Sequence, residues 1–251
     1  MTLLSHDTAG AGPDVVLFHS SVCDRRMWNG QWDTLIKAGF RVTRFDFRGF
    51  GETPAPTGPW DNAADVIALL DELGIDRFHA VGASFGGRVA HQVAARRPER
   101  VERLLLICSA GTVVDGTPDL DAFDTREEEL FEAHDLDALV ALNVETWLGP
   151  EATQETRDFV ADMQRHAFEV QFAGEDVASI KPDFDLADIT AKTLVVQGMH
   201  DLDFFIATAR ALAEQIPGAR LVELDWAGHL PTLENPAKIE PLILNFLSAS
   251  E

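Results

Sequence analysis

The seven residues from Val81 to Gly87, VGASFGG, constrain the fold of this 251-residue chain more than any other segment. They surround one serine, Ser84, with glycine and alanine, and they continue an apolar run that is typical of a buried strand. The residues from Phe85 to Arg97 fit a helix that Pro98 ends. A strand that turns directly into a helix brings two backbones close together, so residues two positions from the serine must be very small. The G-x-S-x-G pattern in this setting predicts a serine on a tight turn with its hydroxyl exposed.

Predicted strands and helices alternate along the rest of the chain. Apolar runs predict strands at 15–18, 78–81, 103–107, 193–197 and 220–224, and alternating apolar and polar residues predict another at 41–45. Helices are predicted between them: one ends at Gly39, one runs from a cap at Asp61 to Gly74, and two more span 204–215 and 237–247. This alternation is typical of βαβ units, so we expect an α/β fold with a mostly parallel sheet flanked by helices.

The segment 112–185 differs from the rest of the chain in structure and in charge. It has helical apolar stripes but no convincing strand, and it carries 20 acidic against 4 basic residues. We interpret it as an acidic helical cap inserted into a core formed by residues 1–111 and 186–251. The acidic run is interpreted as mainly a solvated face. The net charge of −22 argues against nucleic acid or an anionic membrane surface as a partner, because like charges repel.

Composition also predicts a compartment and the absence of cofactors. No apolar run reaches the ~18–20 residues that a membrane-spanning helix needs, and the first residues lack the pattern of a signal peptide. Cys23 and Cys108 lie too far apart in the sequence for a zinc or redox motif. We therefore expect a cytoplasmic protein, a monomer or homodimer, that acts on a small molecule without a metal or other cofactor.

A serine nucleophile needs a base that takes its proton. His229 lies in the loop WAGHLPTLENP after the last predicted strand, at the sheet edge where open α/β sheets gather their sites, and it is the predicted base. His79 and His91 lie within a predicted strand and helix and are interpreted as packed structural histidines.

The base in turn needs an acid that orients it. Asp201 follows the strand predicted at 193–197 and is the predicted acid, with Asp115 as a distant alternative. Asp203 is interpreted as the cap of the next helix, and His200 as a residue that shapes the loop. A His–Asp pair beside a serine needs no metal, so no metal site is assigned.

The chain order Ser84, Asp201, His229 is the order found in the α/β-hydrolase fold, and the sequence resembles that family over essentially its whole length. The resemblance rests on six segments: VGASFGG, LFHSSVCDRRMW, FDFRGFGETP, RRPERV, VVQGMHD and AGHLPTLENP. It implies acyl transfer by a Ser-His-Asp triad, with an oxyanion hole formed by the backbone N–H groups of Ser21 and Phe85. Relatives usually have His-Gly where this chain has His19-Ser20. They also commonly begin with two antiparallel strands, of which at least one is expected to be shortened or missing here, which exposes a sheet edge.

The resemblance also narrows the reaction. Haloalkane dehalogenases and epoxide hydrolases of the family have an aspartate where this chain has Ser84, and the epoxide hydrolases use a cap tyrosine, a residue type this chain lacks. Hydroxynitrile lyases rely on a cap lysine, and the insertion offers only Lys181. Carbon–carbon bond hydrolases usually carry a polar residue where this chain has Ala83. A carboxylic ester or lactone hydrolase is the expected activity.

The charge of the insertion predicts the kind of substrate. A net charge of −16 disfavours the anionic substrates of enol-lactonases, and Arg25 and Arg26 are interpreted as solvated or salt-bridged. We expect a small, neutral or cationic, largely apolar substrate in a pocket lined by Trp28, Trp147, Phe159 and Met163. Packing between cap and core explains these four side chains equally well. Haloperoxidase-like perhydrolysis, thioester cleavage and a small-molecule sensor on a hydrolase scaffold stay open as alternatives.

Overall fold

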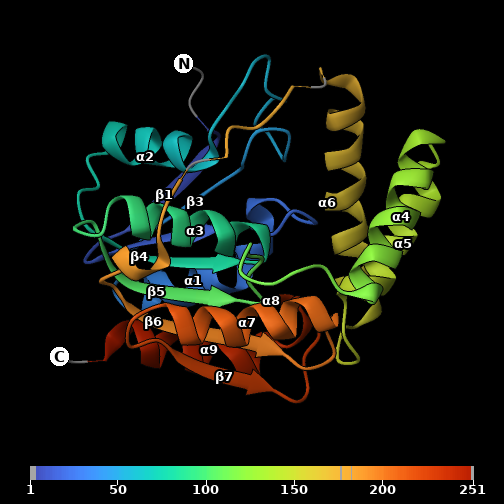
Figure 1. The fold of residues 1–251 in the computed structure, drawn as a ribbon. Coiled ribbons are helices and arrows are strands. Elements are labelled where there is room, and N and C mark those ends of the chain that lie inside the picture. Colours follow the sequence, from blue (N-terminus) through green and yellow to red (C-terminus); the bar gives the residue numbers. More distant parts are fainter. Residues whose placement is uncertain (1–3, 176, 182, 250–251) are drawn as a thin grey trace.

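The computed structural model describes residues 4–175, 177–181 and 183–249. These residues form a seven-stranded sheet in the order β1-β3-β2-β4-β5-β6-β7 (Figure 1). The parallel strands are β2 (Asp14–Phe18), β3 (Arg41–Phe45), β4 (Phe78–Ala83), β5 (Val101–Ile107), β6 (Lys192–Gly198) and β7 (Arg220–Leu224). Only β1 (His6–Gly10), at one edge, pairs antiparallel among the described strands. The expected α/β fold with a mostly parallel sheet is confirmed.

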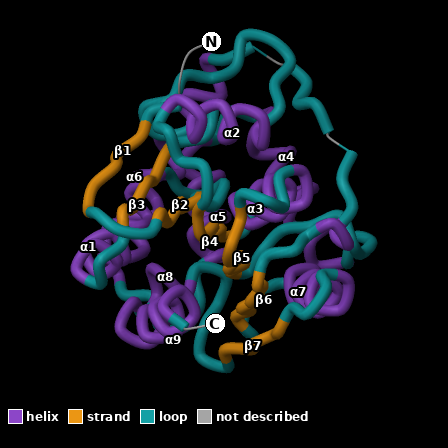
Figure 2. Tube along the Cα trace, turned by 90° about the vertical axis from the view of Figure 1, so that its left-hand side faces the viewer, coloured by secondary structure: helices purple, strands orange, loops and turns teal. Residues whose placement is uncertain are grey.

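Helices cover both faces of the sheet. α1 (Asn29–Lys37) and α9 (Pro236–Ser248) lie on one side of the strands, and α2 (Asn62–Glu72), α3 (Phe85–Arg96) and α7 (Asp203–Gln215) on the other (Figure 2). Alternate residues of β2 enter two different apolar clusters, one beneath each helical layer. Burial on both faces is why the central strands β2 and β4 consist mostly of apolar residues. None of the described helices is long and apolar enough to cross a membrane.

Three helices lie between β5 and β6 in the chain. They are α4 (Pro118–Glu132), α5 (Leu136–Trp147) and α6 (Gln154–Ala173), and they stand beyond the carboxyl ends of the strands (Figure 1). The described part of 112–185 contains no strand, only one isolated bridge from Ser179 to Trp60. The division of the chain into a core and a cap domain stays a prediction.

Local sequence signals identify some helix ends correctly and others not. Asp61 caps α2 as expected, because its side chain accepts the N–H groups of Ala63 and Ala64. Asp203 does not cap α7: it is the first helical residue, and Asp119 of α4 accepts its N–H at 2.6 Å. A carboxylate supplied by a distant helix has taken the place of the local cap. The short elements η1 (Arg25–Trp28), η2 (Leu186–Asp188) and α8 (Pro231–Glu234) complete the described fold.

Candidate active site

Ser84 lies at the turn between β4 and α3. Its backbone has φ 51° and ψ −119°, a conformation that non-glycine residues rarely adopt and that costs about 1–3 kcal/mol. The surrounding structure holds it there: Ser84 donates its N–H to Ile107 at 2.9 Å, and its carbonyl accepts the N–H of Ala110 at 3.0 Å. The serine is therefore fixed between the ends of two neighbouring strands, on the tight turn that the G-x-S-x-G pattern predicts. The expected exposure of its side chain is not found, because Ser84 is only 4% exposed.

The glycines of the motif permit close backbone contacts. A Cβ added to Gly82 would lie 2.7 Å from the carbonyl oxygen of Gly86. A Cβ on Gly86 would collide with the carbonyl oxygens of Phe18 and His19 at the end of β2. Gly82 therefore permits the close approach of β4 to the first turn of α3, and Gly86 permits that turn to sit directly against the end of β2.

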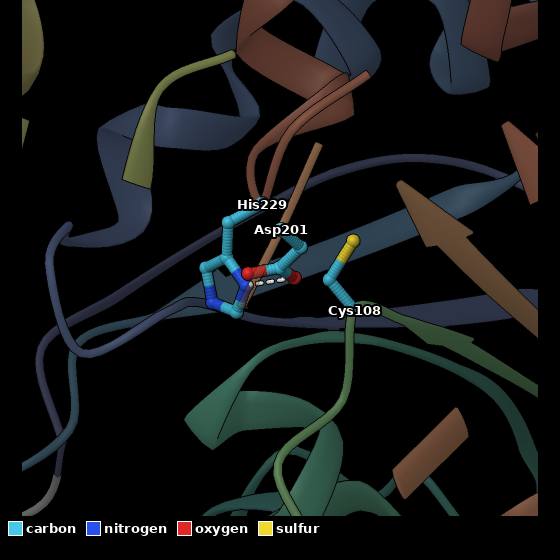
Figure 3. A group of neighbouring side chains, drawn as sticks. All are labelled: Cys108, Asp201 and His229. Atoms are coloured by element: carbon cyan, nitrogen blue, oxygen red, sulfur yellow. Dashed lines mark hydrogen bonds and ion pairs between the residues drawn. The ribbon is translucent and has the colours of Figure 1, made fainter. Parts of the chain in front are cut away.

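His229 and Asp201 form a buried pair. The distance from Nδ1 of His229 to Oδ2 of Asp201 is 2.6 Å, and their side chains are 2% and 0% exposed (Figure 3). Asp201 also accepts the side-chain amide of Gln197 at 2.9 Å and the N–H of Leu202 at 2.8 Å. An ionised carboxylate only accepts hydrogen bonds, so this contact favours the imidazole tautomer with its proton on Nδ1 and a lone pair on Nε2. That tautomer is the one a general base requires.

Aromatic side chains enclose the imidazole. The ring centres of Phe205 and Trp147 lie 4.3 Å and 4.7 Å from that of His229. Trp147 donates its indole N–H to Asn143 at 2.9 Å, and Asn143 donates its amide to Glu127 at 2.8 Å. Burial raises the pKa of the Glu127 carboxyl. A polar chain from α4 through α5 thus fixes the tryptophan that faces the imidazole.

Cys108 completes a cluster that the sequence did not reveal. Its Sγ, a carboxylate oxygen of Asp201 and a ring nitrogen of His229 all lie within 4.8 Å of one another (Figure 3). Burial raises the pKa of the Cys108 thiol well above its ordinary value. A protonated thiol is a weak metal ligand. It instead forms hydrogen bonds, as donor to the carbonyl of Gly228 at 3.7 Å and as acceptor of the Gly198 N–H at 3.4 Å.

The oxyanion hole predicted from the resemblance consists of two backbone N–H groups, those of Ser21 and Phe85. Phe85 is the first residue of α3, and Ser21 lies in the turn after β2. Within the described chain, the N–H of neither residue has an internal acceptor. Unpaired N–H groups at a helix N-terminus and in an adjacent turn can stabilise a developing oxyanion.

The turn that contains Ser21 is held by the strand-end histidine. His19 accepts the Phe47 N–H on Nε2 at 3.0 Å and donates from Nδ1 to the carbonyl of Ser20 at 2.8 Å. Burial lowers the pKa of His19, which keeps the ring neutral. The N–H of Ser20 is donated to the sulfur of Met27 at 3.3 Å, so the serine that replaces the usual glycine is accommodated in a buried turn.

Strand order places the three predicted catalytic residues at one edge of the sheet. Ser84 follows β4, Asp201 follows β6 and His229 follows β7, with β5 between the first two strands. No hydrogen bond joins Ser84 Oγ to His229 in the part of the chain that the structure describes.

The four residues predicted to line the pocket pack within the protein, and the two arginines discussed in the sequence analysis form salt bridges. Trp28, Trp147 and Met163 are buried in one apolar cluster, and half-buried Phe159 packs against it. Their role as pocket walls stays a prediction. Carboxylates engage both arginines: Asp7, Asp46 and Glu52 with Arg25, and Asp24 and Asp162 with Arg26. These arginines line a polar hollow of about 400 Å³ between the loop after β2 and α6.

Of the other histidines, His200 helps to hold its own loop, since its ring nitrogen bonds the Asp225 carbonyl at 3.0 Å. His79 and His91 are buried away from the site, in β4 and α3. Burial lowers the pKa of both, as expected for packed structural histidines.

Comparison with known proteins gives a consistent result. A family profile described as alpha/beta hydrolase fold matches residues 13–236. The chain is 33% identical over 229 residues to a 2-hydroxymuconate semialdehyde hydrolase of Pseudomonas putida, covering 84% of this chain and 78% of that protein. It is 29% identical over 245 residues to a putative carbamate hydrolase of a Caulobacter species, covering 88% and 85%. The crystal structure of the enol-lactonase from Burkholderia xenovorans LB400 aligns with a TM-score of 0.79 at 30% identity, covering 98% and 96%.

Proposed function

This chain belongs to the α/β-hydrolase fold family, and we propose that it is a serine hydrolase that cleaves carboxylic esters or lactones through an acyl-enzyme. The observation that carries the proposal is the 2.6 Å hydrogen bond between His229 and Asp201 at the sheet edge where the strained turn presents Ser84. Hydrolysis as the reaction class follows from the family and its named relatives. The ester or lactone bond is the finer part of the proposal.

In the proposed reaction, His229 takes the proton of the Ser84 hydroxyl through Nε2 while Oγ attacks the substrate carbonyl. The N–H groups of Ser21 and Phe85 donate to the oxyanion that forms. His229 then gives the proton to the leaving oxygen as the carbon–oxygen bond breaks. The same histidine next removes a proton from water, which attacks the carbonyl of the acyl-enzyme. It then returns that proton to Ser84 Oγ as the bond between the acyl group and Oγ breaks and the acid is released. Each oxyanion donor contributes roughly 3–4 kcal/mol of transition-state stabilisation.

We assign a small, neutral and largely apolar substrate. Carboxylates already engage Arg25 and Arg26, so these arginines offer little free positive charge to an anionic acyl group. The acidic segment 112–185, as a cap over the site, would repel such a group further. Trp28, Trp147, Phe159 and Met163 are the candidate apolar walls.

A second candidate is hydrolysis of a bond other than an ester. Two relatives of about 30% identity are named as hydrolases of a semialdehyde and of a carbamate. The proposed nucleophile and base could therefore act on a substrate of either kind. Ala83 offers no polar group beside the nucleophile, which favours the ester or lactone. Perhydrolysis, thioester cleavage and a sensor role remain alternatives for the same site.

The test combines a fluorophosphonate probe with a short p-nitrophenyl ester. We expect the wild-type protein to be labelled and to turn over the ester, and Ser84→Ala to lose both. Folded wild-type protein that is not labelled would refute the serine nucleophile. Labelling with negligible turnover on a broad ester, lactone, thioester and carbamate panel would favour the sensor.

A matched pair of esters tests the substrate class. The two should have acyl groups of the same length, one ending in a methyl group and the other in a carboxylate. We expect the neutral ester to have the higher kcat/KM. Faster turnover of the anionic ester would show that the charge assignment is wrong.

A further inference from the structure

Glu234, at the end of α8, is a buried carboxylate that is only 4% exposed. One of its oxygens accepts the N–H of Gly228 at 2.9 Å, and the other accepts the N–H of Leu230 at 3.0 Å. These two residues flank His229 in the chain. No lysine or arginine of the described residues pairs with Glu234. A buried charge without a countercharge is costly unless hydrogen bonds satisfy it, and here the two backbone bonds do so.

Gly228 is held on its other sides as well. The thiol of Cys108 donates to its carbonyl at 3.7 Å. A Cβ on Gly228 would lie 2.6 Å from the backbone nitrogen of Gly149, which comes between α5 and α6. A Cβ on Gly198, at the end of β6, would collide with the Gly228 carbonyl oxygen. The backbone at Gly228 therefore packs closely between the end of β6 and the 112–185 segment. Both the N–H and the carbonyl of Gly228 form hydrogen bonds.

We propose that Glu234 is a positioning residue for His229. Its carboxylate fixes the backbone on both sides of the imidazole and so keeps the ring in register with Asp201 and aimed at Ser84. The inference rests on the proposed function, because it assigns Glu234 a role relative to the proposed base. Glu234 does not touch the substrate or the reacting atoms.

Only a carboxylate can perform this task at this position. It offers two acceptor oxygens and no donor, which matches two N–H groups that point at it. A glutamine of nearly the same volume would turn an N–H₂ donor toward one of those N–H groups and leave it unpaired. Glu234→Gln therefore removes the constraint on one side of His229 while it preserves packing.

The experiment compares Glu234→Gln with Glu214→Gln, a change of the same chemistry at an exposed position of α7. We expect Glu234→Gln to lower kcat for the p-nitrophenyl ester by about 10²-fold, because a misplacement of about 1 Å costs that much. KM should stay close to the wild-type value, and Glu214→Gln should behave as wild type. The proton on His229 Nδ1, read by ¹⁵N-edited NMR as a downfield signal, should broaden or move only in Glu234→Gln.

The outcomes separate failure of the positioning role of Glu234 from failure of the proposed function. Unchanged kcat and an unchanged Nδ1 proton signal in Glu234→Gln would overturn the positioning role, even where Ser84→Ala abolishes turnover. Turnover that survives Ser84→Ala would refute the proposed function instead, and the NMR signal would still report on the His229–Asp201 pair. If Glu234→Gln does not fold, amide hydrogen exchange of the wild-type protein decides. Slow exchange at Gly228 and Leu230 supports the role, and fast exchange at both refutes it.

Discussion

His229 and His91 are buried to almost the same extent, with 2% and 1% of their surfaces exposed. Each ring also has an aromatic neighbour, Phe205 for His229 and Phe184 for His91. Their polar surroundings differ completely. His229 has the carboxylate of Asp201 at 2.6 Å, whereas neither ring nitrogen of His91 has a partner among the described residues.

The difference determines what each ring can do. Burial, with a smaller contribution from the charge of Arg88, lowers the pKa of His91 to about 3, so this ring stays neutral and inert. For His229 the carboxylate fixes the tautomer and can stabilise the imidazolium that forms when the ring takes a proton. Two residues of the same type and burial thus differ in the chemistry that their surroundings allow, through one neighbouring group.

The largest expected effect comes from removing the paired histidine. His229→Ala should lower kcat by about 10⁶-fold, as expected for loss of a base that acts as a unit with its nucleophile. His91→Leu should leave kcat unchanged, because this ring lies outside the site. Steady-state kinetics with the p-nitrophenyl ester measures both. A comparable loss of activity in the two variants would show that the Asp201 carboxylate does not give His229 a role that His91 lacks.

The next effect tests whether the carboxylate makes the difference. Asp201→Asn should lower kcat by about 10⁴-fold, because the amide would donate to Nδ1 and move the ring proton to Nε2, where it blocks proton abstraction. The fold should be retained, as judged by circular dichroism and thermal unfolding. An Asp201→Asn variant with near wild-type kcat would exclude Asp201 as the orienting acid and reopen the choice of Asp115.

A smaller effect is expected from the aromatic enclosure of His229. Asn143→Leu keeps the side-chain volume but removes the acceptor of the Trp147 indole N–H. We expect kcat to fall about tenfold, or about 1.4 kcal/mol in activation free energy, because Trp147 is no longer fixed against the imidazole. Kinetics at fixed pH measures the change, and Glu214→Gln is the control. An unchanged kcat would show that Trp147 only fills space beside the imidazole.

The sequence predicts the central parallel strands well because strands such as β2 and β4 are buried on both faces and form apolar runs. The predicted bounds of β3 match the structure, and β2 begins one residue earlier than predicted. The strand β1, with the sequence HDTAG, has no apolar alternation and was not predicted. It is held at the sheet edge by backbone pairing with β3, which side-chain patterns do not encode.

In the candidate site, too, some residues can be found from local sequence patterns and others only from the fold. The serine motif and the loop positions of Asp201 and His229 are visible in the sequence. Cys108 was missed, although it directly follows β5, and the strand order brings it beside the loops of its neighbours. Glu234 was not identified because its proposed role depends on the fold of the loop four to six residues earlier, where the N–H groups of Gly228 and Leu230 turn toward it. Such roles require knowledge of which backbone donors lack another partner.

The smallest effect on activity, and a measurable one on stability, is expected for His91→Leu. In the unfolded chain a histidine takes a proton below about pH 6.5, whereas folded His91 does so only near pH 3. Between these values the unfolded state binds the extra proton, so the free energy of unfolding falls by about 1.4 kcal/mol for each pH unit of acidification. His91→Leu removes this contribution.

Relative to wild type, the variant should gain about 2 kcal/mol between pH 6.5 and pH 5, as measured by urea unfolding at both values. Carboxylates titrate in both proteins and cancel in the difference. Arg88, whose charge contributes to the low pKa of His91, is the same in both. A stability difference that does not change with pH would mean that His91 titrates normally in the fold. In that case burial without a partner would not be what separates His91 from His229.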